Sequence, residues 1–171
     1  MTASGPSTPD TVTIRPATAA DRPALWRILE PIFRAGETYP QPRDMSEADA
    51  LAYWLAPAHE VFVAVGRGEI VGTYYLKANQ PGGGAHVANC GYAVREDAAG
   101  RGLARAMWKH SHARALERGF RAMQFNFVVS TNTRAAALWQ ACGFEIVGRL
   151  PGAFAHPLHG DVDAYVMFRR L

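Results

Sequence analysis

The order of predicted elements indicates an α/β fold, in which a mixed, mostly antiparallel sheet of about seven strands is flanked by about four helices. Seven short segments are rich in Val, Ile, Phe and Tyr, as strands are, whereas four longer ones repeat their apolar residues at helical spacing. The resulting order, βααβββαβαββ, has no internal repeat and no room for an interdomain linker. A chain of 171 residues is also long enough for only one such domain.

The chain begins with a polar segment and a short strand. Residues 1–10 (MTASGPSTPD) are small, polar and rich in proline, so we expect a flexible leader there. A single domain is then expected over residues 11–171, with its first strand at 12–15.

Two helices are predicted next. Asp21 is a candidate N-cap, with a proline in the first turn, for a helix that ends near Arg34. After a proline-rich break, Ser46 is placed to begin a second helix, with Asp49 three residues later.

The rest of the chain alternates between strands and helices. Strands at 61–65 and 69–78 are separated by Gly-Arg-Gly, which is typical of a hairpin. The remaining predicted elements are a strand at 85–94, a helix at 102–118, a strand at 121–129, a helix at 132–142, and strands at 144–149 and 162–169.

Composition argues against several classes of protein. No apolar run approaches the roughly 20 residues of a membrane helix, and no secretory signal begins the chain, so we expect a cytoplasmic protein without a membrane partner. The net charge of +3 comes from scattered arginines, which disfavours a nucleic-acid partner. Cys90 and Cys142 lie in patterned segments without metal-site spacing, so buried thiols and no metal are expected.

A glycine-containing loop joins an apolar strand to a helix at Ala99-Gly100-Arg101-Gly102-Leu103-Ala104. Unpaired N–H groups at a helix N-terminus bind anions, and glycine lets the backbone approach a phosphate closely. From the residues alone, a tight turn explains the glycines equally well. A dinucleotide fingerprint would need glycine where Arg105 stands, and the Lys-Ser/Thr of a Walker loop is missing.

Two motifs resemble those of the Gcn5-related N-acetyltransferases (GNAT). The loop is similar to the acetyl-CoA loop Gln/Arg-x-x-Gly-x-Gly/Ala, with Gly102 and Ala104 at the small positions and Ala99 in place of Gln/Arg. The segment Asn132-x-x-Ala135-x-x-Leu138-Trp139-x-x-x-Gly143-Phe144 is similar to the second motif. With the element order, the resemblance covers nearly all of the chain after Thr11.

The resemblance implies a sheet splayed between strands 4 and 5, with acetyl-CoA as acyl donor in the opening. An amine then attacks the thioester directly, without a covalent enzyme intermediate. The residues implied in cofactor binding are Tyr92, Ala93 and Val94 for the pantetheine arm, Ala99, Gly100, Arg101, Gly102, Leu103, Ala104 and Arg105 for the pyrophosphate, and Asn132 for the pantetheine end.

Asparagines in both strands beside the splay are candidates for contact with the acceptor or the thioester carbonyl. Asparagine disfavours strands and is costly to bury unpaired, so Asn89 and Asn126 need partners; neighbouring backbone is the other explanation. Local sequence around both, and around Asn132, also resembles the subgroup with fungal acetyltransferases of azetidine-2-carboxylate. That resemblance implies a small, amino-acid-like amine as acceptor.

Other candidates are weaker. Glu37, in the break between the first two helices, is either a contact for the acceptor ammonium or a solvated loop carboxylate. Trp139 stands where many family members have a catalytic Tyr, and indole is not a usable acid, so packing is its simpler role. The cluster His156, His159, Asp161 and Asp163 has no metal-site spacing and is expected to form turns or a lip over the acceptor site.

The leading hypothesis is therefore an N-acetyltransferase that acts on a small-molecule amine. Ala99 and Trp139 both depart from the family pattern, and they keep open a sensor or scaffold that binds acyl-CoA without turnover. Acetylation of protein N-termini or lysines is a third hypothesis, although no acidic track would recruit a basic tail. Since many relatives form dimers, the resemblance also suggests a homodimer.

Overall fold

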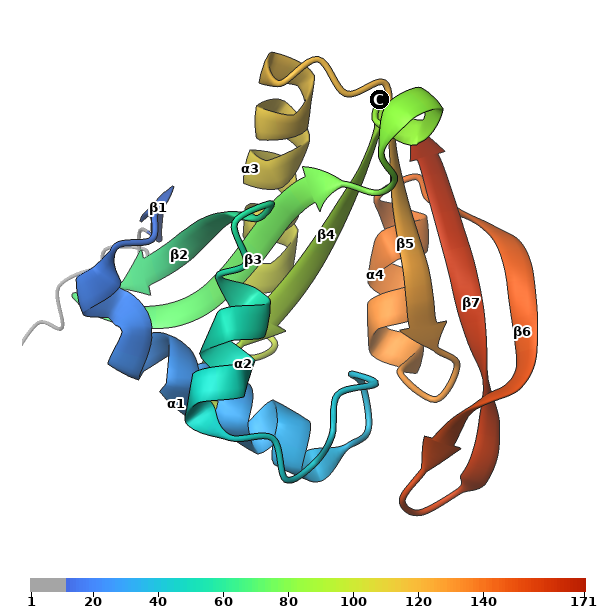
Figure 1. Ribbon diagram of the computed structural model, residues 1–171, viewed down its shortest axis with the longest axis horizontal. Coiled ribbons are helices and arrows are strands. Elements are labelled where there is room, and N and C mark those ends of the chain that lie inside the picture. Colours follow the sequence, from blue (N-terminus) through green and yellow to red (C-terminus); the bar gives the residue numbers. More distant parts are fainter. Residues whose placement is uncertain (1–11) are drawn as a thin grey trace, which may run out of the picture.

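The computed structural model describes residues 12–171, and the predicted leader at 1–10 lies outside them. The sheet is mixed, mostly antiparallel and seven-stranded, as predicted, and its strand order is β1-β2-β3-β4-β5-β7-β6, with neighbouring strands antiparallel except for β4 and β5 (Figure 1). The elements are β1 (Thr13–Pro16), α1 (Arg22–Ala35), α2 (Glu47–Trp54), β2 (Glu60–Gly66), β3 (Glu69–Ala78), β4 (Val87–Val94), α3 (Leu103–Glu117), β5 (Ala122–Val129), α4 (Thr133–Ala141), β6 (Glu145–His156) and β7 (Gly160–Arg170).

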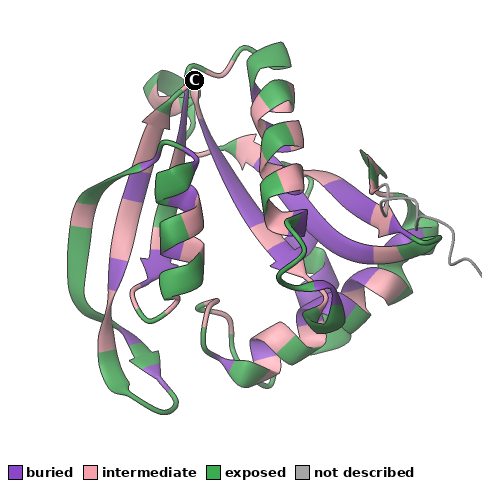
Figure 2. Ribbon diagram, turned by 180° about the vertical axis from the view of Figure 1, so that it is seen from behind, coloured by how far each residue is buried: buried purple, intermediate pink, exposed green. Residues whose placement is uncertain are grey.

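Helices cover both faces of the sheet. One apolar cluster joins α1 and α2 to residues such as Tyr75 and Ala93, and another joins α3 and α4 to the opposite face through Met107, Trp139 and their neighbours. Figure 2 shows the buried positions concentrated along the central strands and the inner sides of the helices. The helices thus stabilise the sheet from both sides and leave the space between β4 and β5 as its discontinuity.

The predicted splay lies between β4 and β5. The two strands pair only at Val87 with Ala122 and at Ala88 with Met123, and from there they diverge (Figure 1). The two faces of the sheet can therefore communicate through the gap between these strands.

Local sequence signals mostly have their predicted effect. The Ser46 hydroxyl accepts a hydrogen bond from Asp49 N at 3.1 Å and caps α2. Arg67 and Gly68 both have positive φ, 52° and 78°, which gives the tight turn between β2 and β3. Asp21 stands at the N-cap of α1 as expected, but its side chain does not cap the helix, because the carboxylate accepts from Thr18 N at the turn before α1 and from the Arg15 guanidinium of β1.

The last hairpin is longer than predicted. The predicted strands end near Arg149 and begin near Val162, whereas β6 continues to His156 and β7 begins at Gly160. The strand passes Pro151 and Gly152 because the register shifts between Leu150 and Phe154, on an edge strand that needs fewer N–H donors.

Candidate active site

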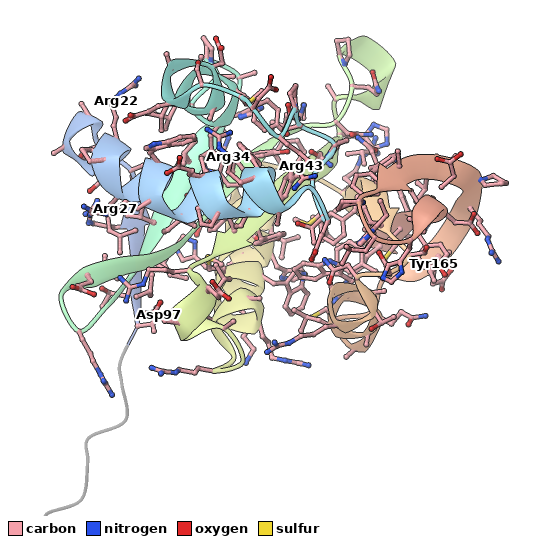
Figure 3. The ribbon with its side chains drawn as sticks, turned by 90° about the horizontal axis from the view of Figure 1, so that it is seen from below. Arg22, Arg27, Arg34, Arg43, Asp97 and Tyr165 are labelled. Atoms are coloured by element: carbon pink, nitrogen blue, oxygen red, sulfur yellow. The ribbon has the colours of Figure 1, made fainter. Side chains whose placement is uncertain are left out.

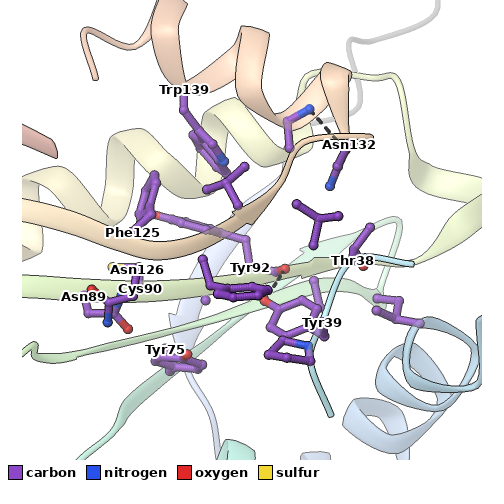
Figure 4. A pocket seen from close by; sticks show the side chains of 18 of the residues that line it. Thr38, Tyr39, Tyr75, Asn89, Cys90, Tyr92, Phe125, Asn126, Asn132 and Trp139 are labelled. Carbon is purple, nitrogen blue, oxygen red and sulfur yellow. Dashed lines mark hydrogen bonds between the residues drawn. The ribbon is translucent and has the colours of Figure 1, made fainter. Parts of the chain in front are cut away.

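A cavity of about 360 Å³ occupies the gap between β4 and β5 (Figure 4). Its lining comes from both faces of the sheet: the connection after α1, strands β3, β4 and β5, and the start of α4. The side chains that matter below are Tyr39, Tyr53, Tyr75, Lys77, Asn89, Tyr92, Asn126, Asn132 and Trp139.

The main chain of β4 turns unpaired groups toward this gap. Val87 O accepts from Asn79 N at 2.8 Å on the β3 side, whereas His86 O accepts from Arg121 N at 2.9 Å on the β5 side. Because successive residues of a strand alternate, even-numbered residues of β4 direct their N–H and C=O groups toward β5. Past the last bridge these groups belong to Cys90, Tyr92 and Val94.

One of these carbonyl groups is bonded by the protein itself. The Tyr39 hydroxyl donates to Tyr92 O at 2.8 Å and so attaches the connection between α1 and α2 to the gap. Two further hydrogen bonds attach the same connection to α1: Arg34 donates to Met45 O at 2.9 Å, and Arg43 donates to Arg34 O at 2.8 Å (Figure 3). Burial raises the pKa of the Tyr39 hydroxyl, so it stays protonated as a donor.

Asn89 bridges the two diverging strands. Its side chain is 7% exposed, and Nδ2 donates to Gln124 O of β5 at 2.9 Å. A carbonyl oxygen can only accept, so the amide orientation is fixed and Oδ1 is left as an acceptor. The alternative explanation for Asn89, a bond to neighbouring backbone, is therefore correct for one of its two polar atoms.

Asn126 has a different setting. It is exposed, its Oδ1 accepts from Gln124 Nε2 at 2.8 Å, and its Nδ2 donates to Asn79 Oδ1 at 2.7 Å. This chain of side-chain amides extends from β5 to the end of β3 across the mouth of the cavity. Both polar atoms of Asn126 thus have partners within the protein.

An aromatic wall closes the cavity on the side of α1 and α2. The Tyr75 ring stacks on His59 at 4.2 Å between centroids, and its hydroxyl lies 3.4 Å from that of Tyr53. The ring also covers Gly91, where a Cβ would come within 2.5 Å of Tyr75. Burial, and to a lesser extent the charge of Lys77, lowers the pKa of His59, so its imidazole is neutral at neutral pH.

The glycine loop connects β4 to α3, lies outside the residues that line the cavity, and approaches Arg134 of α4. Gly100 and Gly102 both have positive φ, 82° and 77°, so the loop needs residues without a side-chain penalty. Gly102 is the N-cap of α3, and nothing lies within 4 Å of a Cβ placed there. At Gly100 such a Cβ would be 3.0 Å from Arg134 Nη2, which brings a guanidinium from α4 to the loop.

These features fit a CoA thioester. A pyrophosphate would be matched by the start of the fifteen-residue helix α3, by the open space at Gly102 and by the Arg134 cation. The free main-chain groups of β4 would suit the amide-containing pantetheine arm. Arg134 lies beside the loop position at which Ala99 replaces the polar residue of the motif.

Comparison with known proteins identifies the family of the chain. The sequence profile of the Acetyltransferase (GNAT) family matches residues 22–144. The chain belongs to the GNAT family.

Relatives of this GNAT protein include solved structures and a curated protein. A GCN5-related N-acetyltransferase from Kribbella flavida is 41% identical, with a TM-score of 0.89 over 94% of this chain and 98% of that one. A phosphinothricin acetyltransferase from Sinorhizobium meliloti, solved with acetyl-CoA, has the same fold at 24% identity, with a TM-score of 0.82 over 94% of this chain and 89% of that one.

The curated relative is N-acetyltransferase aca1 of Schizosaccharomyces pombe, 32% identical over 98 residues, which are 57% of this chain. The chain matches only about half of that protein's length, 47%. At the level of the family, the comparisons confirm the predicted fold and the N-acetyltransferase class, and acetyl-CoA as the acyl donor fits that family.

The second motif of the GNAT protein sits at the start of α4. Asn132 accepts from Ala135 N at 3.3 Å, so it caps the helix while its side chain lines the cavity. Trp139 is 7% exposed and packs against Tyr92 and Phe125, with ring centroids 4.9 and 5.0 Å away. The packing role predicted for Trp139 is thus correct, and its edge also borders the cavity.

Of the three predicted catalytic residues, Glu37 is the one that does not line the cavity of the GNAT structure, and the predicted loop residues 99–105 also lie outside the lining. The Glu37 side chain is exposed, and among the described residues the cavity lining includes its neighbours Thr38 and Tyr39 instead. Its role in binding the acceptor stays a prediction.

Sequence reasoning missed four residues of the GNAT site: Tyr39, Tyr75, Lys77 and Arg134. Tyr75 and Lys77 are two apart on a predicted strand, so their shared face was visible as a period of two. Nothing in the sequence indicated that Tyr39 or Arg134 would reach across from other elements.

Other candidates have structural partners. His156 is buried, and its Nδ1 accepts from Leu158 N at 3.1 Å; Asp163 accepts from Gly152 N at 2.9 Å. Over residues 12–171, no three His, Cys, Asp or Glu side chains gather as metal ligands.

Cys90 and Cys142 are buried free thiols, as predicted. No helix in this part of the chain is long and apolar enough to cross a membrane.

Proposed function

We propose that this protein transfers the acetyl group of acetyl-CoA to the amine of a small, amino-acid-like molecule. The observation that carries the proposal is the cavity between β4 and β5, which has a phosphate-type loop toward one face of the sheet and an aromatic wall on the other. A donor and an acceptor that enter from opposite faces would meet between the strands.

The donor side would be held mainly by backbone. Acetyl-CoA supplies a thioester whose acyl carbon is open to attack by an amine. In our proposal the amides at 99–105, with Arg134 beside them, bind the pyrophosphate, and the main chain at 92–94 binds the pantetheine arm. Asn132 has its Nδ2 available toward the pantetheine end, since its Oδ1 caps α4.

On the acceptor side, Asn89 is the proposed contact for the amine, because its Oδ1 is left as an acceptor beside the gap. Asn126 is proposed to contact the acceptor at the mouth, and Glu37 to attract its ammonium group from the surface. Tyr39 keeps the wall in place through its bond to Tyr92 O.

The lining has no carboxylate and no histidine among the described residues, so a general base is absent from the cavity itself. We therefore expect the amine to lose its proton to water. In that case kcat/KM rises with pH until the pH reaches the pKa of the acceptor amine, and a plateau near pH 7 for an amine of higher pKa would contradict this.

A thiol-release assay tests the proposal. Purified protein is given acetyl-CoA and a panel of free amino acids, azetidine-2-carboxylate and simple amines, and the release of CoA is followed. Acceptor-dependent release supports transfer. Tight CoA binding without release for any acceptor would instead favour the sensor hypothesis. That hypothesis rests on Ala99 and Trp139, which depart from the family pattern.

Protein acetylation is tested in the same assay with peptides from histone and ribosomal-protein tails. Within residues 12–171, the cavity lining contains no carboxylate that would attract a basic peptide, so we expect free amino acids to react and the peptides not to. The reverse result would replace the small-molecule hypothesis.

Asn126→Ala tests the acceptor side. We expect kcat to fall by about five- to thirtyfold while CoA affinity stays unchanged, because a lost hydrogen bond to a substrate is worth roughly 1–2 kcal/mol. Asn79→Ala is the matched control, since it removes the partner of Asn126 from outside the cavity lining. Equal losses in both variants would mean that the amide chain matters only for structure.

Three further proposals concern the whole protein. We propose that residues 11–171 act as one N-acetyltransferase domain, which the continuous sheet supports. The homodimer stays a prediction, to be checked by light scattering. The cytoplasmic location also stays a prediction, to be checked by fractionation of cells that express the protein.

A further inference from the structure

The charge inside the cavity is unbalanced. Among the described residues that line it, Lys77 is the only one with a full charge at neutral pH. No ion pair or hydrogen bond joins Lys77 to another described side chain, and His59 nearby is neutral. A cation without a counter-ion, beside a partly enclosed space, favours an anionic group in that space.

Lys77 stands directly opposite Asn89. The two residues are register partners on β3 and β4, so their Cβ atoms are neighbours at roughly 5 Å on the same face of the sheet. Asn89 has its Oδ1 free as an acceptor, because the bond across the gap uses only one of the two N–H groups of Nδ2, which donates to Gln124 O. A cationic donor and a neutral acceptor therefore lie side by side next to the proposed point of transfer.

Such a pair matches a molecule in which an amine and an anionic group are separated by one or two carbons. The uncharged amine would donate an N–H to Asn89 Oδ1 and keep its lone pair free, while the anion would bind the Lys77 ammonium. Tyr75 lies on the same face of β3, two residues from Lys77, so the rest of the molecule would contact its ring.

We propose that Lys77 is a specificity-determining residue, which selects acceptors that carry an anionic group, a carboxylate in particular, next to the amine. This inference rests on the proposed function. It names the substrate class of the same cavity as α-amino or β-amino acids rather than simple amines.

The test compares each amino acid with its own carboxamide, which keeps the side chain but removes the anionic charge. Both are measured at a pH above the pKa of both amines, because loss of the carboxylate also lowers the pKa of the amine. A charge-assisted hydrogen bond is worth about 10- to 100-fold, so we expect kcat/KM for the acid to exceed that for the amide by that factor in the unchanged protein. In Lys77→Met the ratio should fall to near one, and in Lys77→Arg it should largely be kept.

Lys109→Met is the matched control, because Lys109 is exposed on α3, away from the cavity lining. It should keep the full preference, and all variants should keep their melting temperature. If the unchanged protein accepts the amide as well as the acid, or if Lys77→Met keeps the preference, the role of Lys77 is refuted.

Binding gives a second readout that does not need turnover. Calorimetry with the same amino acids, in the presence of CoA, should show weaker binding to Lys77→Met than to the unchanged protein by a similar factor. If binding depends on Lys77 but no acetyl transfer occurs, the proposed function fails while the anion site stands. If transfer occurs but neither binding nor preference depends on Lys77, only this inference fails.

Aminoalkylphosphonates distinguish the kind of anion. A carboxylate site should prefer the amino acid over the phosphonate of the same chain length. The opposite preference would keep an anion site at Lys77 but overturn the carboxylate.

Discussion

Gly102→Val separates the backbone requirement of the glycine loop from its contact with the cofactor. Gly102 has φ 77° and ψ 8°, a conformation that costs a residue with a side chain roughly 1–2 kcal/mol. Since nothing lies within 4 Å of a Cβ there, this backbone strain is the expected effect on stability, and it corresponds to a drop of roughly 2–8 °C in Tm.

The effect on CoA is expected to be larger than the effect on stability. A valine at the N-cap of α3 would occupy the open space in which we place the pyrophosphate, so at least one charge-assisted hydrogen bond to the loop would be lost. At about 1.5–3 kcal/mol for such a bond, CoA affinity should fall by at least about tenfold, measured by calorimetry.

Gly119→Val provides the control from the other end of α3. Gly119 has φ 81°, and nothing lies within 4 Å of a Cβ there, so it carries the same strain without a proposed ligand. Its variant should lose similar stability and keep CoA affinity. Unchanged CoA affinity in Gly102→Val, or an equal loss in both variants, would refute the assignment of the loop.

Two further substitutions test the acceptor wall and the stability of the fold. In Gly91→Ala the new methyl group would lie 2.5 Å from the Tyr75 ring and displace it, so KM for the acceptor should rise several-fold while CoA affinity is kept, and an unchanged KM would show that the ring does not contact the acceptor. The Arg15 guanidinium holds the pKa of the buried Asp21 carboxyl well below its usual range. Asp21→Asn weakens this pair and should lower the free energy of unfolding by about 2 kcal/mol at pH 7, measured with urea. Because the lowered pKa stabilises the fold only above about pH 4, the difference between this variant and the parent should shrink as the pH falls below 4, and a constant difference would exclude the ion pair as its cause.

The framework of the site was predictable because it depends on local patterns. Periodicity located the strands on both sides of the gap, and the two glycines of the loop indicated a tight turn or a phosphate loop before a helix, where the structure gives both a positive φ. The resemblance to GNAT motifs then supplied what periodicity does not contain, namely that β4 and β5 separate. Asn89 was recognisable because asparagine in a strand requires a partner.

Contacts between distant segments were not predictable. Tyr39 bonds a carbonyl 53 residues away, and its position depends on how the connection after α1 folds back over the sheet. The exposed position of Glu37 also depends on the path of this connection, because the chain turns at Gly36, where φ is 65°, and leaves Glu37 at the surface. Pro151 and Gly152 misled the prediction for β6, because their effect on a strand depends on whether it lies at an edge.

The hydrogen bond from Tyr39 to Tyr92 O also has a kinetic consequence. It joins the wall of the acceptor side to the strand along which we place the donor, so this segment cannot swing outward while the bond is intact. A neutral hydrogen bond of this kind contributes only about 1 kcal/mol net. Opening of the segment requires this bond to break, which makes opening less than about tenfold slower than it would be without the bond. This hydrogen bond would thus retain a molecule bound behind Tyr39 only weakly, and it would not by itself prevent release within a catalytic cycle.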